Sequence, residues 1–251
     1  MSFAVTADAY DRFMGRYSVQ LSPQFADFAD VRSGRVIDVG CGSGALTGEL
    51  VNRLGPTHVS AIDPSESLVA AVRERFPGVD VRVAAAERLP FPNSAFDAAL
   101  AQLVVHFMSD PVAGLREMAR VVRKDGVVAA CVWDHGSGRG PLSLFWQAAR
   151  ELDPEVKDES RRAGAREGHL AELFVEAGLR DVEVTALEAR VDHATFEEWW
   201  EPFTLGVGPA GAYTSKLDAD RRARLIERCR QLLPPAPFEI TAWAWTARGL
   251  A

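Results

Sequence analysis

Residues 36–50, with the sequence VIDVGCGSGALTGEL, constrain the fold more than any other stretch of this chain. Their first four residues are mostly apolar and β-branched, which predicts a short buried strand. Three glycines follow at alternate positions, where a chain can turn sharply and let a ligand approach its backbone. Leu46, Leu50 and Leu54 then recur on one face of a helix. A strand, a glycine loop and a helix start together predict a site for a nucleotide-like ligand.

Strand and helix patterns alternate regularly from about residue 34 to residue 134. Apolar or alternating runs predict further strands at 58–63, 79–84, 96–101 and 126–133. The last of these runs is apolar throughout, as expected in the middle of a parallel sheet. Asp63 ends the second predicted strand, where a carboxylate is well placed to accept hydrogen bonds from a ribose diol.

After Trp133 the alternation becomes irregular. Residues 134–141 are predicted to be a flexible loop, and the charge-dense stretch 153–168 is predicted to be solvated. His169 and His193 are interpreted as surface or capping residues. The remaining predictions are helices at 142–152, 170–177, 196–203 and 217–233, strands at 182–191 and 238–246, and a loose glycine-rich stretch at 205–214.

Composition narrows the class of protein. The net charge of −7 argues against a nucleic-acid or membrane-surface binder, because such proteins usually carry a basic field. Three widely spaced cysteines do not suggest a disulfide framework, so a reducing, cytoplasmic location is expected. No signal peptide is recognised at the N-terminus, and no apolar run is long enough to span a membrane.

The motif from Asp38 to Gly44, DVGCGSG, resembles the D/E-x-G-x-G-x-G signature of class I S-adenosylmethionine-dependent methyltransferases. Asp63 resembles the ribose-binding acid of that family, and Ala86-Glu87 followed by Leu-Pro-Phe resembles its adenine loop. The matches keep their order from about residue 34 to residue 134. Within the family the chain resembles the small-molecule group related to the ubiquinone and menaquinone methyltransferases. The segment 10–17, YDRFMGRY, also resembles some members of that group.

This resemblance implies an α/β fold with a Rossmann-like, mostly parallel seven-stranded sheet. Helices are expected on both faces, with an antiparallel strand at the C-terminus. We expect residues 1–251 to form a single methyltransferase domain. Its expected parts are an N-terminal lid and helix (1–33), a donor-binding core (34–134), an acceptor-side helical elaboration (135–235) and a final strand (236–251).

The resemblance further implies that S-adenosyl-L-methionine binds along the glycine loop and leaves as S-adenosyl-L-homocysteine. The cofactor-binding residues implied are Asp38, Gly40, Cys41, Gly42, Gly44, Asp63, Pro64, Ala86, Glu87, Ala101 and Gln102. Tyr10 and Tyr17 either pack the N-terminal segment against the sheet or close over the ligand as a lid.

Methyl transfer from a sulfonium is an in-line displacement with a good leaving group. The protein therefore mainly positions donor and acceptor and excludes water. No metal is expected, because no group of His, Cys, Asp or Glu has metal-ligand spacing. His106 and His135, which follow the fourth and fifth predicted strands, are the candidate catalytic bases. Either histidine could instead line the pocket without transferring a proton.

The expected acceptor is a small organic molecule, methylated at O, N or C, and a homodimer is a candidate assembly. Aromatic residues in the C-terminal half favour an apolar or planar acceptor if they line its pocket. Two other functions stay open. One is an NAD(P)-dependent oxidoreductase, because Gly40, Gly42 and Ala45 also satisfy the looser dinucleotide fingerprint. The other is a non-catalytic module that binds S-adenosylmethionine.

Overall fold

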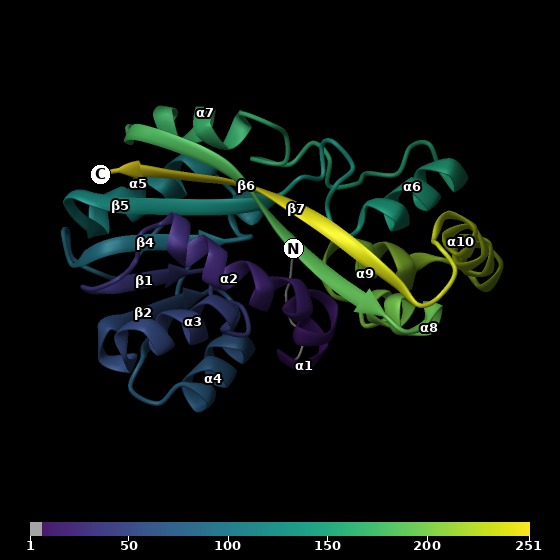
Figure 1. Cartoon of the computed structure of the whole chain (residues 1–251), viewed down its shortest axis with the longest axis horizontal. Coiled ribbons are helices and arrows are strands. Elements are labelled where there is room, and N and C mark those ends of the chain that lie inside the picture. Colours follow the sequence, from purple (N-terminus) through teal and green to yellow (C-terminus); the bar gives the residue numbers. More distant parts are fainter. Residues whose placement is uncertain (1–6) are drawn as a thin grey trace.

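A computed structural model of the chain describes residues 7–251; the predicted start of the lid, residues 1–6, lies outside the described residues. Its seven strands form one sheet in the order β3-β2-β1-β4-β5-β7-β6. The strands are β1 (Val36–Val39), β2 (Val59–Asp63), β3 (Asp80–Val83), β4 (Phe96–Gln102), β5 (Val122–Trp133), β6 (Arg180–His193) and β7 (Phe238–Leu250). Strands β1 to β5 are parallel, and β7 runs antiparallel to both of its neighbours (Figure 1). The predicted fold class, with its antiparallel C-terminal strand, is confirmed.

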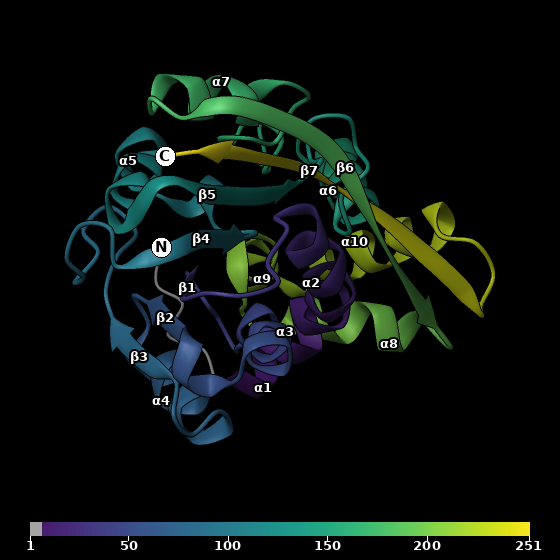
Figure 2. The ribbon, with the colours of Figure 1, turned by 60° about the vertical axis from the view of Figure 1, so that its left-hand side comes forward.

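Helices cover both faces of the sheet (Figure 2). The α-helices are α1 (Ala7–Tyr10), α2 (Arg16–Phe28), α3 (Ala45–Leu54), α4 (Glu66–Arg75), α5 (Pro111–Val121), α6 (Ser143–Leu152), α7 (His169–Glu176), α8 (Phe196–Trp200), α9 (Gly208–Lys216) and α10 (Ala219–Leu232). Residues 7–251 also contain four short helices of other types. One is π-helical, η1 (Asp11–Gly15), and three are 3₁₀-helical, η2 (Pro56–His58), η3 (Val105–Phe107) and η4 (Glu201–Thr204).

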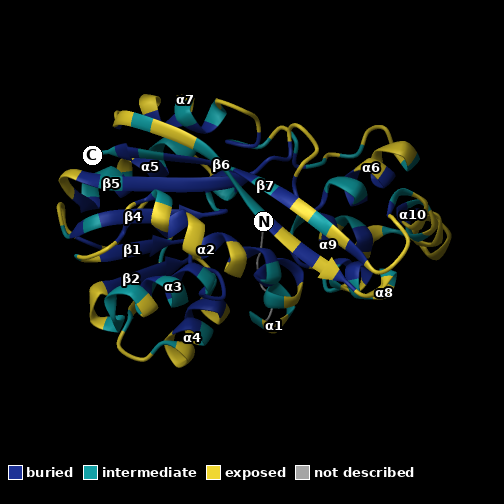
Figure 3. Ribbon diagram, in the orientation of Figure 1, coloured by how far each residue is buried: buried dark blue, intermediate teal, exposed yellow. Residues whose placement is uncertain are grey.

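The two largest hydrophobic cores lie on opposite faces of the central strands. On one face, Leu21 and Phe25 of α2 and Leu50 of α3 are fully buried. On the other face, Leu115 of α5 and Phe174 of α7 are fully buried. Strands β1 and β4 are buried along almost their whole length (Figure 3), which is the pattern predicted for the middle of a parallel sheet.

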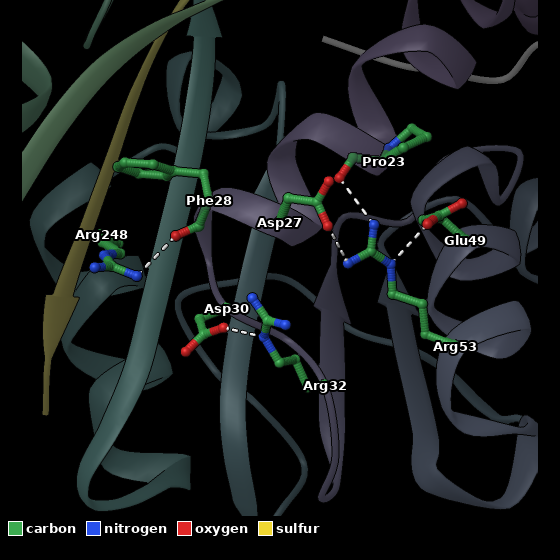
Figure 4. A network of polar contacts seen from close by, with 8 residues as sticks. All are labelled: Pro23, Asp27, Phe28, Asp30, Arg32, Glu49, Arg53 and Arg248. Atoms are coloured by element: carbon green, nitrogen blue, oxygen red, sulfur yellow. Dashed lines mark hydrogen bonds and ion pairs between the residues drawn. The ribbon is translucent and has the colours of Figure 1, made fainter.

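Polar contacts fix helix α2 in place at its C-terminal end (Figure 4). Arg53 of α3 donates to Asp27 Oδ1 at 2.7 Å and to the carbonyl oxygen of Pro23 at 3.0 Å. Arg248 of β7 donates to the carbonyl oxygen of Phe28 at 2.9 Å. Helix α2 is therefore tied both to α3 and to the last strand, and it provides a fixed base for the segment that precedes it.

Strands β6 and β7 continue well past the point where β7 stops pairing with β5. Around this long antiparallel strand pair, helices α6, α8, α9 and α10 gather beyond the carboxyl ends of β4 and β5 (Figure 2). In open parallel sheets, ligands bind outside the carboxyl ends of the strands. The C-terminal elaboration therefore lies on the side of the sheet where a site is expected.

Two local predictions, the loose stretch 205–214 and the surface position of His193, were wrong because tertiary packing overrides local composition. The stretch predicted to be loose contains helix α9, which buries Ala210 and Thr214. The stretch 153–168 is largely exposed or half-buried, as predicted, but it contains Glu159, which is only 2% exposed. His193, interpreted as a surface or capping residue, is buried on β6. The predicted flexible loop is closed by the fully buried Asp134, whose carboxylate accepts bonds from the loop.

All three cysteines are buried and unbridged. Among the helices that the structure describes, none combines the length and the apolar character needed to cross a membrane.

Candidate functional site

The glycine loop between β1 and α3 is held against β2 by backbone hydrogen bonds. Gly40 N and Cys41 N both donate to the carbonyl oxygen of Ile62 at 2.8 Å. Gly40 has a φ of +75°, and a Cβ there would lie 2.5 Å from the Val104 side chain. Only glycine fits this position, because the Val104 side chain packs directly against the loop backbone there.

Asp63 anchors the same loop from the end of β2. Its Oδ2 accepts from Gly42 N at 2.9 Å, and its Oδ1 accepts from Ser65 N at 2.8 Å. Burial raises the pKa of this carboxyl. A carboxylate has acceptor sites for further bonds, so these contacts are compatible with the predicted ribose contact. Pro64 is exposed and leads into α4, and Gly44 immediately precedes α3.

Asp38 lies buried in β1 with one oxygen unused. Thr47 Oγ1 donates to its Oδ2 at 2.6 Å, whereas Oδ1 has no hydrogen-bond partner. Burial, together with the nearby charge of Asp63, raises the pKa of Asp38 to about 7. The hydrogen bond from Thr47 acts in the opposite direction and lowers this pKa. Gln102 on the neighbouring strand has an equally unpartnered Oε1, while its Nε2 donates to the carbonyl oxygen of Ser18. Unpaired buried acceptors suit a ligand that brings donors, such as an ammonium group.

The predicted adenine loop begins just after β3. Ala86 is buried, and Glu87 Oε1 accepts from Ser109 N at 2.7 Å and from Asp110 N at 3.3 Å. The Glu87 carboxylate therefore stabilises the turn before α5. Ala101 is fully buried at the end of β4. Contacts from these residues to a cofactor stay predictions.

Tyr10 and Tyr17 have different surroundings. The Tyr10 ring lies over Gly42, where a Cβ would be 3.3 Å from its Cε1. Desolvation and the charge of Asp63 raise the pKa of the Tyr10 hydroxyl. Tyr17 instead packs edge-on against Trp133 and places its hydroxyl 3.3 Å from His193 Nε2. The structure therefore places Tyr10 against the glycine loop and gives Tyr17 packing contacts.

A cavity, here called the inner cavity, adjoins this loop. Its apolar walls include Phe13, Met14, Leu103, Leu142 and Val207. Its polar lining consists of Tyr10, His106, Glu159 and the indole of Trp133, whose buried Nε1 has no partner. An apolar cavity with a few convergent polar groups is the usual form of a small-molecule site.

The two histidines predicted as candidate bases come together beside this cavity. The ring centroids of His106 and His135 are 6.0 Å apart, and both residues are buried. Desolvation holds the pKa of His106 well below its usual range and lowers that of His135 to about 4. Both imidazoles are therefore neutral near pH 7.

Glu159 joins the two histidines and was missed by sequence reasoning. Its Oε2 accepts from Trp146 Nε1 at 3.1 Å, and burial raises the pKa of its carboxyl. Its neighbours along the chain are mostly charged, and nothing in their pattern distinguishes it. One ligand atom each from His106, His135 and Glu159 lie within 4.8 Å of one another. Spacing along the chain could not reveal this group, because its members come from three separate segments.

Comparisons with known proteins agree with this architecture. A family model described as a methyltransferase domain matches residues 37–130. The chain is 32% identical over 152 residues to 2-methyl-6-phytyl-1,4-hydroquinone methyltransferase 2 of Oryza sativa, covering 60% of this chain and 40% of that protein. It is 32% identical over 150 residues to phosphatidylethanolamine N-methyltransferase of Cereibacter sphaeroides, covering 57% of this chain and 72% of that protein.

The fold is also similar to that of a solved structure. The YcgJ protein from Bacillus subtilis superimposes with a TM-score of 0.61 at 19% identity, covering 91% of this chain and 97% of that one. The sheet order is that of the class I, Rossmann-like fold. This chain belongs to the S-adenosylmethionine-dependent methyltransferase family. It spans less than half the length of the rice relative.

Proposed function

We propose that this chain transfers the methyl group of S-adenosylmethionine to a small, largely apolar organic acceptor in the inner cavity. The observation that carries the proposal is the position of Tyr10, which both covers Gly42 of the glycine loop and lines the inner cavity. A donor on the loop and an acceptor in the cavity would then be neighbours. Two relatives are named for a phytylhydroquinone and for phosphatidylethanolamine, both of which carry long hydrocarbon groups.

The roles of the chain's own residues follow from their unused hydrogen-bonding groups. S-adenosylmethionine, when bound, supplies an electrophilic methyl group on a sulfonium. Asp38 Oδ1 and Gln102 Oε1 are the unpartnered acceptors proposed to receive its ammonium group. Asp63 is proposed to accept from the ribose, and the loop at Ala86 and Glu87 to frame the adenine. The apolar walls exclude water and leave an in-line displacement at the methyl carbon.

Entry of the acceptor requires the N-terminal segment to open. The inner cavity encloses about 30 Å³, which is room for only one or two water molecules. The segment over it is held by three ion pairs, Asp11 with Arg75, Arg12 with Glu201 and Arg16 with Glu198. Exposed pairs contribute only about 0–1 kcal/mol each, so most of the cost of opening comes from exposing the buried Phe13 and Met14, at about 1.5–3 kcal/mol each. We propose that residues 7–15 act as the lid, with Tyr10 at its tip.

The choice of cofactor is tested by calorimetric titration with S-adenosylhomocysteine, NADH and NADPH. We expect saturable binding of S-adenosylhomocysteine only. Binding of NADH or NADPH, with no binding of S-adenosylhomocysteine, would favour the oxidoreductase alternative. Transfer of a labelled methyl group to a member of an acceptor panel separates an enzyme from a non-catalytic binding module. The same panel identifies O, N or C as the atom methylated.

Donor binding is expected to weaken as the pH falls through about 7. The ionised form of Asp38 attracts the ligand's ammonium group, and the pKa of about 7 means that acid removes this charge. The dissociation constant of S-adenosylhomocysteine should be flat above about pH 8 and rise up to tenfold per pH unit below 7. Calorimetry between pH 5.5 and 8.5 measures it.

Two variants separate Asp38 from other titrating groups. Asp38→Asn should bind about 10- to 100-fold more weakly at pH 8 and lose this pH dependence. Thr47→Val removes the hydroxyl that favours the ionised form and should move the midpoint to higher pH. The same pH profile in Asp38→Asn and wild type would refute the assignment.

We also propose a cytoplasmic location, supported by the three unbridged cysteines. A homodimer stays a proposal, which analytical ultracentrifugation would test.

A further inference from the structure

Three side chains from distant parts of the chain converge beside the inner cavity, and two of them, His106 and Glu159, line it. His106 lies in η3 after β4, His135 follows β5, and Glu159 lies between α6 and α7. All three residues are at most 8% exposed, and one ligand atom of each lies within 4.8 Å of the others. Within residues 7–251, this is the only such group of His, Cys, Asp and Glu residues.

One polar atom of this group lacks the partner that a folded protein normally provides. His106 Nδ1 is buried without a hydrogen-bond partner. Buried polar groups in native proteins are nearly always paired, so an orphaned imidazole nitrogen indicates an additional ligand. Glu159 is held by Trp146 Nε1 at one oxygen, as carboxylates that bind metals are commonly held by an outer hydrogen-bond donor.

We propose that His106, His135 and Glu159 bind one divalent transition-metal ion of the zinc or ferrous type. Two imidazoles with one carboxylate suit these ions, whereas Mg²⁺ and Ca²⁺ prefer oxygen ligands throughout. Metal–ligand bonds of about 2.1 Å place tetrahedral ligands roughly 3.4 Å apart. The three ligand atoms now lie within 4.8 Å of one another, so side-chain rotations that move each atom by about 1 Å would bring them to the spacing of a metal site. His106 and Glu159 also line the inner cavity, so the remaining coordination position faces it.

The role of the metal rests on the proposed function. An ion at this position would bind the hydroxyl oxygen of a phenolic or enolic acceptor and lower its pKa. The O–H proton passes to water before the lid closes and excludes it, and the oxygen electron pair then forms a bond to the methyl carbon. The carbon–sulfur bond breaks as this bond forms, and its electron pair stays on the sulfur of S-adenosylhomocysteine. His106 is then a metal ligand, and no histidine base is needed.

Arg162 provides the competing explanation. Its Nε lies 3.9 Å from Glu159 Oε1, and its Nη1 donates to the carbonyl oxygen of His106 at 3.0 Å. If this guanidinium alone neutralises Glu159, the three residues form a metal-free polar cluster. The two explanations differ in one measurable quantity, the affinity of the folded chain for a metal.

The test uses the full chain prepared without a polyhistidine tag, stripped with EDTA and dialysed. Titration with Co²⁺, followed by visible absorption, and with Zn²⁺, followed by calorimetry, measures stoichiometry and affinity. We expect one equivalent to bind, with at least 100-fold weaker binding in Glu159→Gln and in His135→Ala. Trp146→Phe should weaken binding about tenfold, because it removes only the outer donor. His193→Gln changes a buried histidine outside the group and should bind metal as wild type does.

Each variant is first checked for a cooperative thermal transition and for binding of S-adenosylhomocysteine. Failure of the folded wild-type chain to bind Co²⁺ or Zn²⁺ stoichiometrically overturns the proposal, as does undiminished binding by folded Glu159→Gln. Metal binding without S-adenosylhomocysteine binding would leave the metal site standing and refute the proposed function. Binding of S-adenosylhomocysteine without metal binding would refute only the metal site.

Discussion

Replacing Gly40 with alanine is expected to weaken binding of S-adenosylhomocysteine at least 100-fold. The new Cβ would lie 2.5 Å and 2.6 Å from the two Cγ atoms of Val104, well inside van der Waals contact. The residue also has a φ of +75°, which a residue with a Cβ adopts only with strain. The loop backbone must therefore move, and the hydrogen bond from Gly40 N to Ile62 fixes the part of the loop proposed to face the donor. Calorimetry on the folded variant measures the loss.

The structure offers two control variants for the loss of donor binding in Gly40→Ala. Gly168 has a nearly identical φ of +76°, but nothing lies within 4 Å of the position its Cβ would take. Gly168→Ala therefore introduces similar backbone strain outside the glycine loop and should leave donor affinity unchanged. Adding Val104→Ala to Gly40→Ala removes the two Cγ atoms and should restore part of the affinity. Wild-type affinity in Gly40→Ala would refute the assignment of the loop as the donor site.

The sequence predicts the N-terminal half of this structure well because its signals are local. The run before Gly40 contains enough β-branched residues to identify a strand, and the leucines after Gly44 follow a helical period. A parallel sheet also brings the carboxyl ends of its strands together, so Asp38, Asp63 and Gln102 could be assigned to one end of the sheet. The unpartnered oxygens of Asp38 and Gln102 were not predictable, because they depend on which neighbours the fold supplies.

The acceptor side was predictable only in part, because its contacts are long-range. His106 and His135 were identified one at a time from their positions after two strands, and their proximity follows from the pairing of β4 with β5. Glu159 reaches them through a segment of irregular backbone whose charged residues favour exposure. Its burial depends on Trp146 of α6, and no period or spacing encodes that contact.

Replacing Phe145 with alanine is expected to cost about 3–5 kcal/mol of folding stability. Phe145 of α6 is fully buried, and its ring stacks on Phe203 with centroids 4.5 Å apart and an interplanar angle of 5°. It also contacts Trp146 and Tyr213 edge-on. Truncation leaves a cavity that these large rings cannot fill, which is the usual reason for losses of this size. For a chain of this length, we expect the melting temperature to fall by roughly 6–20 °C.

This substitution also tests whether the C-terminal elaboration and the donor-binding core are one domain. The two long strands β6 and β7 pass through both parts, so we expect wild type and Phe145→Ala each to unfold in one transition. Val175→Ala is the control: Val175 is 64% exposed on α7, and its loss should change stability by less than about 0.5 kcal/mol. Calorimetric melting with and without S-adenosylhomocysteine measures these effects. The single-domain proposal would be contradicted by two transitions, of which one responds to S-adenosylhomocysteine and only the other is shifted by Phe145→Ala. That result would show that the elaboration unfolds separately.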